Sequence, residues 1–186
     1  MKGFERKDLQ LSLCGLNCAL CPMQADGNCP GCGGGAGNAS CSIARCSLEH
    51  GKVEYCFQCE AFPCERYKAD DAWDSFVLHR NWKQDMEKAR RAPGAYHSQL
   101  KAKQEILREL LDKYNDGRHK SFFCTAVNLL ELERLQRVMG QLEKGEAAPA
   151  KELAARAKEW MQGEARQQGV ELRLRKKPAS KEWGTV

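Results

Sequence analysis

The chain has 186 residues, of which 30 are basic and 25 acidic, and a formal net charge of +5. Its length predicts one domain or two small ones. Residues 1–10 have no apolar run behind their basic side chains, which argues against a secretory signal. No stretch approaches the roughly 20 apolar residues that span a bilayer. We therefore expect a cytoplasmic protein without a membrane partner.

Cysteine is the unusual component, with 11 residues in the chain. All but one lie between Cys14 and Cys64, and Cys124 stands apart in an apolar stretch, where it is expected to be a small buried hydrophobe. Cytoplasmic proteins rarely keep disulfides, and an odd number of cysteines fits a closed disulfide framework poorly. The clustered cysteines therefore suggest metal binding.

The composition of the sequence changes near Tyr67. Residues 1–67 are rich in Gly and Cys and carry 6 basic and 7 acidic residues, whereas residues 68–186 carry 24 and 18. An acidic segment matches a phosphate backbone poorly, so any nucleic-acid contact would have to come from the second segment. We expect a Cys-rich metal-binding module over residues 1–67 and a helical domain with a basic tail over residues 68–186.

Short strands are predicted within the Cys-rich segment. Leu9–Leu13 (LQLSL) alternates apolar and polar residues, and Val53–Tyr55 (VEY) could pair locally. Between them Gly31–Asn38 (GCGGGAGN) indicates a flexible loop.

About four helices are predicted after the Cys-rich segment. The first is capped by Asp70 and Asp71, carries Trp73, Phe76 and Val77 on one face, and ends at Pro93-Gly94. The others run from there to about Tyr114, from about Ser121 to Leu142, and from Pro149 onward. The alternation in Gly169–Pro178 predicts a terminal strand. The expected fold class is thus α-rich, a small α+β protein.

The spacing of the cysteines is typical of metal ligands. Two residues between cysteines allow a tight turn to direct both sulfur atoms at one ion, and CPGCG at Cys29–Gly33 has the form of a zinc knuckle. Zinc also supplies folding energy to segments that lack an apolar core. The ten candidate ligands are Cys14, Cys18, Cys21, Cys29, Cys32, Cys41, Cys46, Cys56, Cys59 and Cys64.

Two zinc ions are expected within residues 14–64. Division in chain order places Cys18, Cys21, Cys29 and Cys32 on one ion and Cys41, Cys46, Cys56 and Cys59 on the other, but a cross-braced arrangement is also open. Cys14 and Cys64 could replace members of either set, and Cys64 could instead be a reactive thiol at a helix start. His50 could substitute as a ligand or be a solvated loop residue. Iron–sulfur clusters use the same ligands and remain the alternative.

Four motifs resemble the signature of an uncharacterised Cys-rich family of bacteria and archaea. These are CGLNCALCP (Cys14–Pro22), CPGC (Cys29–Cys32), CSIARC (Cys41–Cys46) and CFQCEAFPCER (Cys56–Arg66). Asp116–Leu130 is also similar to a segment found in some members. The resemblance implies a metal-binding module and carries no activity or catalytic residue.

No catalytic constellation is evident, so the expected function is binding rather than catalysis. Sites saturated with cysteine are structural, because a catalytic zinc keeps an open position. We expect a protein partner, with nucleic acid as a weaker possibility through the basic tail Leu172–Lys181. The rival function is that of an iron–sulfur or thiol-redox protein, in electron transfer or oxidant sensing.

Overall fold

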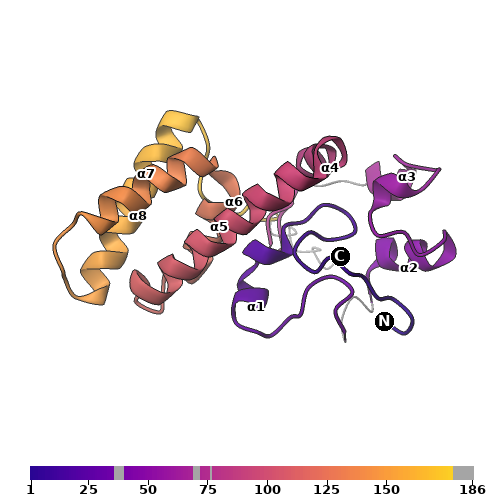
Figure 1. Cartoon of the computed structure of the whole chain (residues 1–186), viewed down its shortest axis with the longest axis horizontal. Helices are drawn as coiled ribbons and strands as arrows, with labels where there is room; N and C mark the ends of the chain where they lie inside the picture. The colour runs from indigo at the N-terminus through magenta and orange to yellow at the C-terminus, as the bar shows by residue number, and fades with distance from the viewer. Residues whose placement is uncertain (36–39, 69–71, 76, 178–186) are drawn as a thin grey trace, which may run out of the picture.

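The computed structural model describes residues 1–35, 40–68, 72–75 and 77–177. Within these ranges the protein is helical, with eight α-helices, two short 3-10 helices and no sheet. Figure 1 shows the helices of the second half gathered on one side and the Cys-rich segment on the other. The predicted α+β class, with its short strands and terminal strand, is therefore wrong. The elements are η1 (Cys18–Leu20), α1 (Pro22–Ala25), α2 (Ser42–Glu49), η2 (Cys56–Gln58), α3 (Glu65–Lys68), α4 (Trp82–Arg91), α5 (Pro93–Lys113), α6 (Lys120–Leu129), α7 (Leu132–Glu143) and α8 (Ala150–Gln168).

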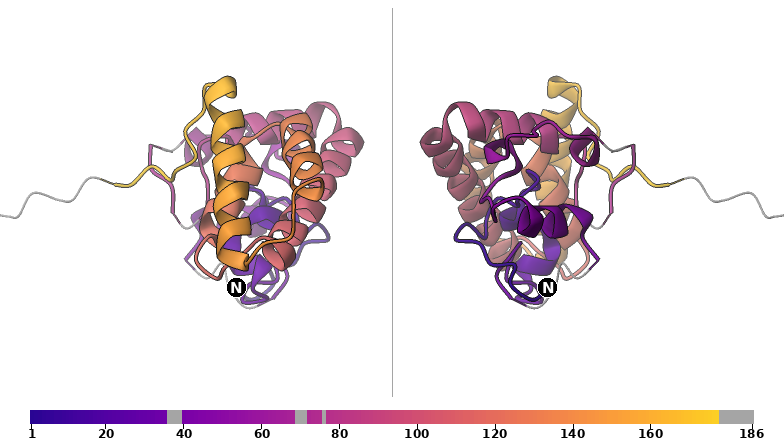
Figure 2. Two further views of the ribbon diagram at one scale, coloured as in Figure 1. Left: turned by 90° about the vertical axis from the view of Figure 1, so that its left-hand side faces the viewer. Right: turned by 90° about the vertical axis from the view of Figure 1, so that its right-hand side faces the viewer.

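The long helix α5 is the centre of the helical part. It packs against α4, α6 and α7, and α7 packs against α8 (Figures 1 and 2). Its buried residues include Leu100, Leu107 and Leu110, which follow helical spacing and join the main hydrophobic core. Phe123 and Leu130 are fully buried in the same core. Burial of this amphipathic face, rather than helix propensity alone, holds the helices together.

Helix boundaries follow the sequence in part. Pro93 begins α5 as an N-terminal proline, and α8 begins directly after Pro149. The helix expected from Asp70 begins only at Trp82, and its expected residues Asp70, Asp71 and Phe76 lie outside the described residues. The helix expected over 121–142 is two helices, because Leu130 is extended at a ψ of 144° between α6 and α7.

Each predicted strand is replaced by turns and side-chain contacts. Leu9–Leu13 forms one isolated bridge, between Leu11 and Asn17, where the chain turns back on itself. Val53–Tyr55 is not a strand, since the amide of Gln58 accepts from the backbone N–H groups of Glu54 and Tyr55.

The expected terminal strand is an irregular segment whose carbonyls are bound by a side chain. The guanidinium of Arg80 donates to the carbonyls of Glu171 (3.0 Å) and Arg173 (2.8 Å). Backbone groups that a strand ladder would pair are thus satisfied without a partner strand. Pro178 lies outside the described residues.

The start of the Cys-rich segment is built into the main core. Leu11, Ala19 and Leu20 are buried in the same cluster as the helices, and η1 packs against α5 and α6. The rest of the segment has a smaller cluster around Phe4, Leu13 and Ala44. None of the described helices combines the length and the hydrophobicity needed to cross a membrane.

Candidate metal centre

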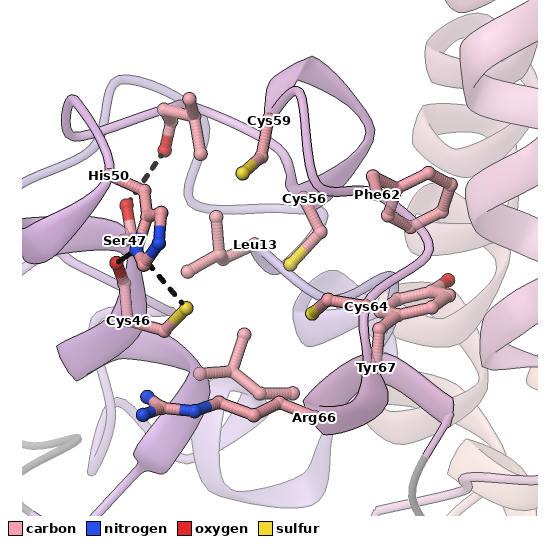
Figure 3. Close-up of a pocket in the computed structure, with 12 residues that line it drawn as sticks. Leu13, Cys46, Ser47, His50, Cys56, Cys59, Phe62, Cys64, Arg66 and Tyr67 are labelled. Carbon is pink, nitrogen blue, oxygen red and sulfur yellow. Dashed lines mark hydrogen bonds between the residues drawn. The ribbon is translucent and has the colours of Figure 1, made fainter.

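Four cysteines line one small cavity in the Cys-rich segment. Cys46 lies on α2, Cys56 begins η2, Cys59 follows η2, and Cys64 directly precedes α3. Figure 3 shows their side chains pointing toward a shared space, beside Leu13. We call these four residues the Cys56 group. The cavity volume is about 30 Å³, roughly a tenth of the ~300 Å³ at which pockets for organic ligands begin, so its size suits an ion and not an organic substrate.

Local structure explains how these side chains converge. Cys56 and Cys59 flank a tight 3-10 turn in which the N–H of Cys59 donates to the carbonyl of Cys56 (3.1 Å). The N–H of Cys56 donates to the carbonyl of Leu13 (2.9 Å), which fixes this turn against the beginning of the chain. The C-x2-C spacing therefore forms the type of turn that the sequence predicted for a pair of ligands.

His50 also lines the cavity, at the end of α2. Its Nδ1 lies 2.9 Å from the carbonyl oxygen of Cys46 and 3.6 Å from Cys46 Sγ. The contact with the carbonyl is the one that a helix-ending histidine commonly makes, so the solvated-loop and ligand interpretations both stay open for His50.

Arg66 lines the cavity and lies close enough to the thiol of Cys46 to affect its ionisation. Burial raises the pKa of Cys46, the guanidinium of Arg66 opposes this, and the neighbouring thiols of Cys64 and Cys59 raise it again. Burial also raises the pKa of Cys56, with Cys14 and Cys64 adding to the shift. Arg66 was not predicted as part of the site, although FPCER placed it within two residues of Cys64.

A second set of thiols lies nearby and comprises Cys14, Cys18, Cys32 and Cys41; we call it the Cys32 group. Burial, together with the thiols of Cys32 and Cys14, raises the pKa of Cys18 to about 12. Burial raises the pKa of Cys14 to about 11, to which Cys32 and Cys41 contribute. Backbone N–H groups also point at these sulfur atoms, since Cys41 Sγ accepts from the N–H of Ala44 (3.4 Å). Such N–H donors are typical of thiolate ligands.

Arg6 is a residue of this site that sequence reasoning missed. Its guanidinium donates to the carbonyls of Cys32 (3.1 Å) and Glu54 (2.8 Å) and lies over the ring of Tyr55 (5.3 Å). Burial raises the pKa of Cys32, while the N–H of Leu13 and the charge of Arg6 oppose that rise. The sequence offers no signal for Arg6, because it is 26 residues from Cys32.

The structure distributes the cysteines differently from the division in chain order. Cys41 lies close enough to Cys14 and Cys32 to raise the pKa of each thiol, and Cys64 lines the cavity of Cys46, Cys56 and Cys59, where the division in chain order placed Cys41. Cys14 also raises the pKa of Cys56, so its place in either set stays open.

The remaining cysteines have other surroundings. Cys21 is buried as the residue before α1, and it lies close enough to Cys124 for its charge to raise the pKa of that thiol, which burial raises to about 12 overall. Cys124 is buried, as predicted. Cys29 does not line the cavity of the Cys56 group. All eleven cysteines are free thiols.

Neither group is arranged as a finished coordination sphere. In residues 1–35, 40–68, 72–75 and 77–177, no set of three or more Cys, His, Asp or Glu side chains already stands at the spacing that holds a metal ion. The chemistry of the donors nevertheless fits zinc or an iron–sulfur cluster, both of which take four thiolates.

Comparison with known proteins adds no assignment. No model of a known protein family, no curated protein and no solved structure matches the chain. The resemblance to a Cys-rich family therefore stays a prediction from the motifs.

Proposed function

We propose that residues 14–64 bind two metal ions, one at the Cys56 group and one at the Cys32 group, and that both ions are mainly structural. Zinc is the favoured metal. The observation that carries the proposal is the convergence of Cys46, Cys56, Cys59 and Cys64 on a cavity that has room for a single ion. Four thiols from three separate segments would close a tetrahedral site if their sulfur atoms moved inward.

A structural role follows from the composition of each group. Four thiolate ligands saturate zinc and leave no open position for water or substrate. The segment around the groups has few buried apolar side chains, so metal binding would supply much of its folding free energy. The cations of Arg6 and Arg66 beside the groups would partly offset the negative charge of such sites.

Macromolecular binding is the biochemical role that we propose for the assembled module. The cavity of the Cys56 group is too small for an organic substrate, and a saturated zinc site does not catalyse. A rigid module held by two ions presents a fixed surface to a partner, and a protein partner suits its acidic composition better than nucleic acid does. The basic tail Leu172–Lys181 could still contact nucleic acid, and residues 178–181 of it lie outside the described residues.

The alternative is an iron–sulfur or thiol-redox protein. The same four thiols would hold a cluster, and the donor set does not separate the two metals. Colour distinguishes the two possibilities, because an iron–sulfur protein is brown and absorbs near roughly 400 nm, whereas a zinc protein is colourless.

Metal analysis of the full chain tests the proposal. Protein purified anaerobically from metal-replete medium should be colourless and contain two zinc ions per chain. Cys56→Ser and Cys32→Ser should each lose one ion, and the matched control Cys124→Ser should keep both. Absence of metal from the unmodified chain would contradict the proposal, and iron with sulfide in place of zinc would establish the alternative.

A further inference from the structure

A larger cavity lies away from both cysteine groups, where the loop before η1 meets the helices. Its volume is about 270 Å³, against about 30 Å³ for the cavity of the Cys56 group. It is lined by Asn17 from the loop, Asp85 from α4, Tyr96 and Lys103 from α5, and Asn128 from α6. This volume is near the lower end of the range for ligand sites, so the cavity suits a molecule with few heavy atoms.

A buried hydrogen-bond network forms one wall of this cavity. The amide nitrogen of Asn17 donates to Asp85 Oδ2 (3.0 Å) and to Asn128 Oδ1 (3.2 Å), and the hydroxyl of Tyr96 donates to Asn17 Oδ1 (2.8 Å). All four residues are less than 10% exposed. Their positions are therefore fixed by partners from four different segments before any ligand arrives.

Charged side chains of both signs line the cavity: Asp85 and Glu131 are acidic, and Arg80, Lys88 and Lys103 are basic. Among the described residues, Asp85 forms no ion pair although its carboxylate is buried. The ammonium of Lys103 donates to the backbone carbonyl of Asn128 (3.2 Å) rather than to a carboxylate. Burying a charge without an ionic partner is costly, and groups held in this way are concentrated at functional sites.

The pKa values of Asp85 and Lys103 are both shifted toward the neutral form of the group. Burial raises the pKa of Asp85, although the charges of Lys88 and Lys103 oppose the shift. Burial lowers the pKa of Lys103 to about 8, with Asp85 opposing. An opposite charge in the cavity would counter both shifts, lowering the pKa of Asp85 and raising the pKa of Lys103.

We propose that this cavity binds a small zwitterion of the α-amino acid class, with its ammonium toward Asp85 and its carboxylate toward Lys103. A simple anion would suit the basic side chains Arg80, Lys88 and Lys103 but would meet the buried Asp85, whereas a simple cation would meet those three basic side chains. The side-chain amides of Asn17 and Asn128 also line the cavity and provide uncharged hydrogen-bonding groups. A role in folding alone would be fulfilled by the network and leaves the cavity unexplained. This proposal goes beyond metal binding and does not depend on it.

Titration calorimetry of the full metal-loaded chain with each of the 20 common L-amino acids, added singly at about 10 mM, tests the proposal. At least one should bind one to one with a Kd on the order of 1 mM or tighter, since a ligand of this size has few atoms for contact. Sodium acetate and methylammonium chloride, which carry one charge each, should not bind at the same concentration.

Variants then locate the binding site. Lys103→Gln and Asp85→Asn should each weaken binding of that amino acid at least tenfold, and Lys101→Gln, an exposed change on the same helix, should leave it unchanged. If Asp85→Asn fails to fold, Lys103→Gln alone tests whether the amino acid binds in this cavity. Failure of all the amino acids to bind, equal binding of acetate, or unchanged binding by a folded Lys103→Gln would each overturn the proposal.

Discussion

The imidazole Nε2 of His97 lies 2.9 Å from the carboxylate of Asp8, which joins helix α5 to the segment before the first cysteine. The hydroxyl of Tyr55 donates to the same carboxylate oxygen (2.6 Å). Asp8 therefore connects three parts of the chain: the N-terminal segment, the turn that carries Cys56, and the helical part. Its environment makes this junction sensitive to pH.

The sign of that sensitivity follows from both partners. Burial favours neutral His97, but the hydrogen bonds to Asp8 and to the carbonyl of Pro93, together with the charge of Asp8, outweigh it and raise the pKa of His97 above its ordinary 6.5. Burial likewise opposes ionisation of Asp8, but hydrogen bonds from Tyr55 and His97 lower its pKa below 3.8 overall. Charged His97 therefore stabilises the fold below pH 6.5, and the contribution disappears as pH rises through the raised pKa. Ionised Asp8 stabilises it above pH 3.8, and that contribution disappears as pH falls through the lowered pKa.

Replacement of His97 should accordingly lower stability in a pH-dependent way. His97→Gln should lower the unfolding temperature more at about pH 5.5 than at about pH 8.5, because the ion pair exists mainly at the lower value. Thermal unfolding followed by circular dichroism at the two pH values measures this. Lys113→Gln, which removes an exposed ion pair on the same helix, is the control and should show little effect at either pH. An equal loss at both pH values for His97→Gln would contradict the assignment.

Cys64 should behave as a metal ligand that anchors the Cys-rich segment to the helical domain. In the metal-loaded protein Cys64 should resist alkylation, and Cys64→Ser should lose one ion per chain and unfold at lower temperature. Mass spectrometry after brief treatment with iodoacetamide identifies the labelled thiols. Cys124→Ser, the control, removes a buried thiol outside both groups and should keep both ions. Rapid labelling of Cys64 with full retention of metal would instead support a reactive thiol with a redox role.

Removal of metal should lower the protease resistance of some segments and leave that of others unchanged. A strong chelator should make residues 41–64 sensitive to protease, because these residues have little apolar burial of their own. Leu11, Ala19 and Leu20 should stay protected, since they are buried in the core of the helical part. Limited proteolysis with peptide mapping checks both expectations. Unchanged resistance of residues 41–64 after complete loss of metal would show that the ions are not structural.

Two glycines should respond to alanine in opposite directions. Gly15 has a φ of +103°, and a Cβ there would collide with the carbonyl oxygen of Trp82, so Gly15→Ala should destabilise the protein by about 3 kcal/mol. Gly140 lies inside α7 with nothing within 4 Å of the added carbon, so Gly140→Ala should stabilise it by about 1 kcal/mol. Denaturant unfolding gives both values. A neutral Gly15→Ala would mean that the loop before η1 does not pack against α4 as described.

The helices were predictable where local pattern and tertiary packing agree. Pro93 and Pro149 fixed helix starts, and the apolar spacing in α5 predicted its buried face. The break at Leu130 was not predictable, because it depends on α8: the N–H of Glu131 donates to the side chain of Gln168 (3.1 Å). The false strands had the right alternation, yet their backbone groups are satisfied by Arg80 and by turns that only the folded chain brings near.

The candidate sites were likewise predictable only in part. Cysteine spacing predicted the turn at Cys56 and Cys59, but spacing does not state which distant cysteines complete a group, so the division in chain order stays a prediction beside the grouping that the cavity suggests. The cavity at Asp85 went unnoticed, because charged residues on a helix are usually solvated. One signal was available: Asp85 falls on the buried stripe of α4, between Trp82 and Met86, where a carboxylate is not expected.

Asn17 occupies a position with consequences for both proposals. It lies between Cys14 and Cys18 in the chain, and its side chain forms part of the wall of the larger cavity. An ion at the Cys32 group and a zwitterion in the cavity would therefore both contact one short loop, and a shift of that loop on binding one would change the affinity for the other. Thermodynamic reciprocity then requires that the metal change the affinity for the amino acid by the same factor as the amino acid changes the affinity for the metal. Through this loop, the occupancy of each site would depend on the concentrations of both the metal ion and the amino acid.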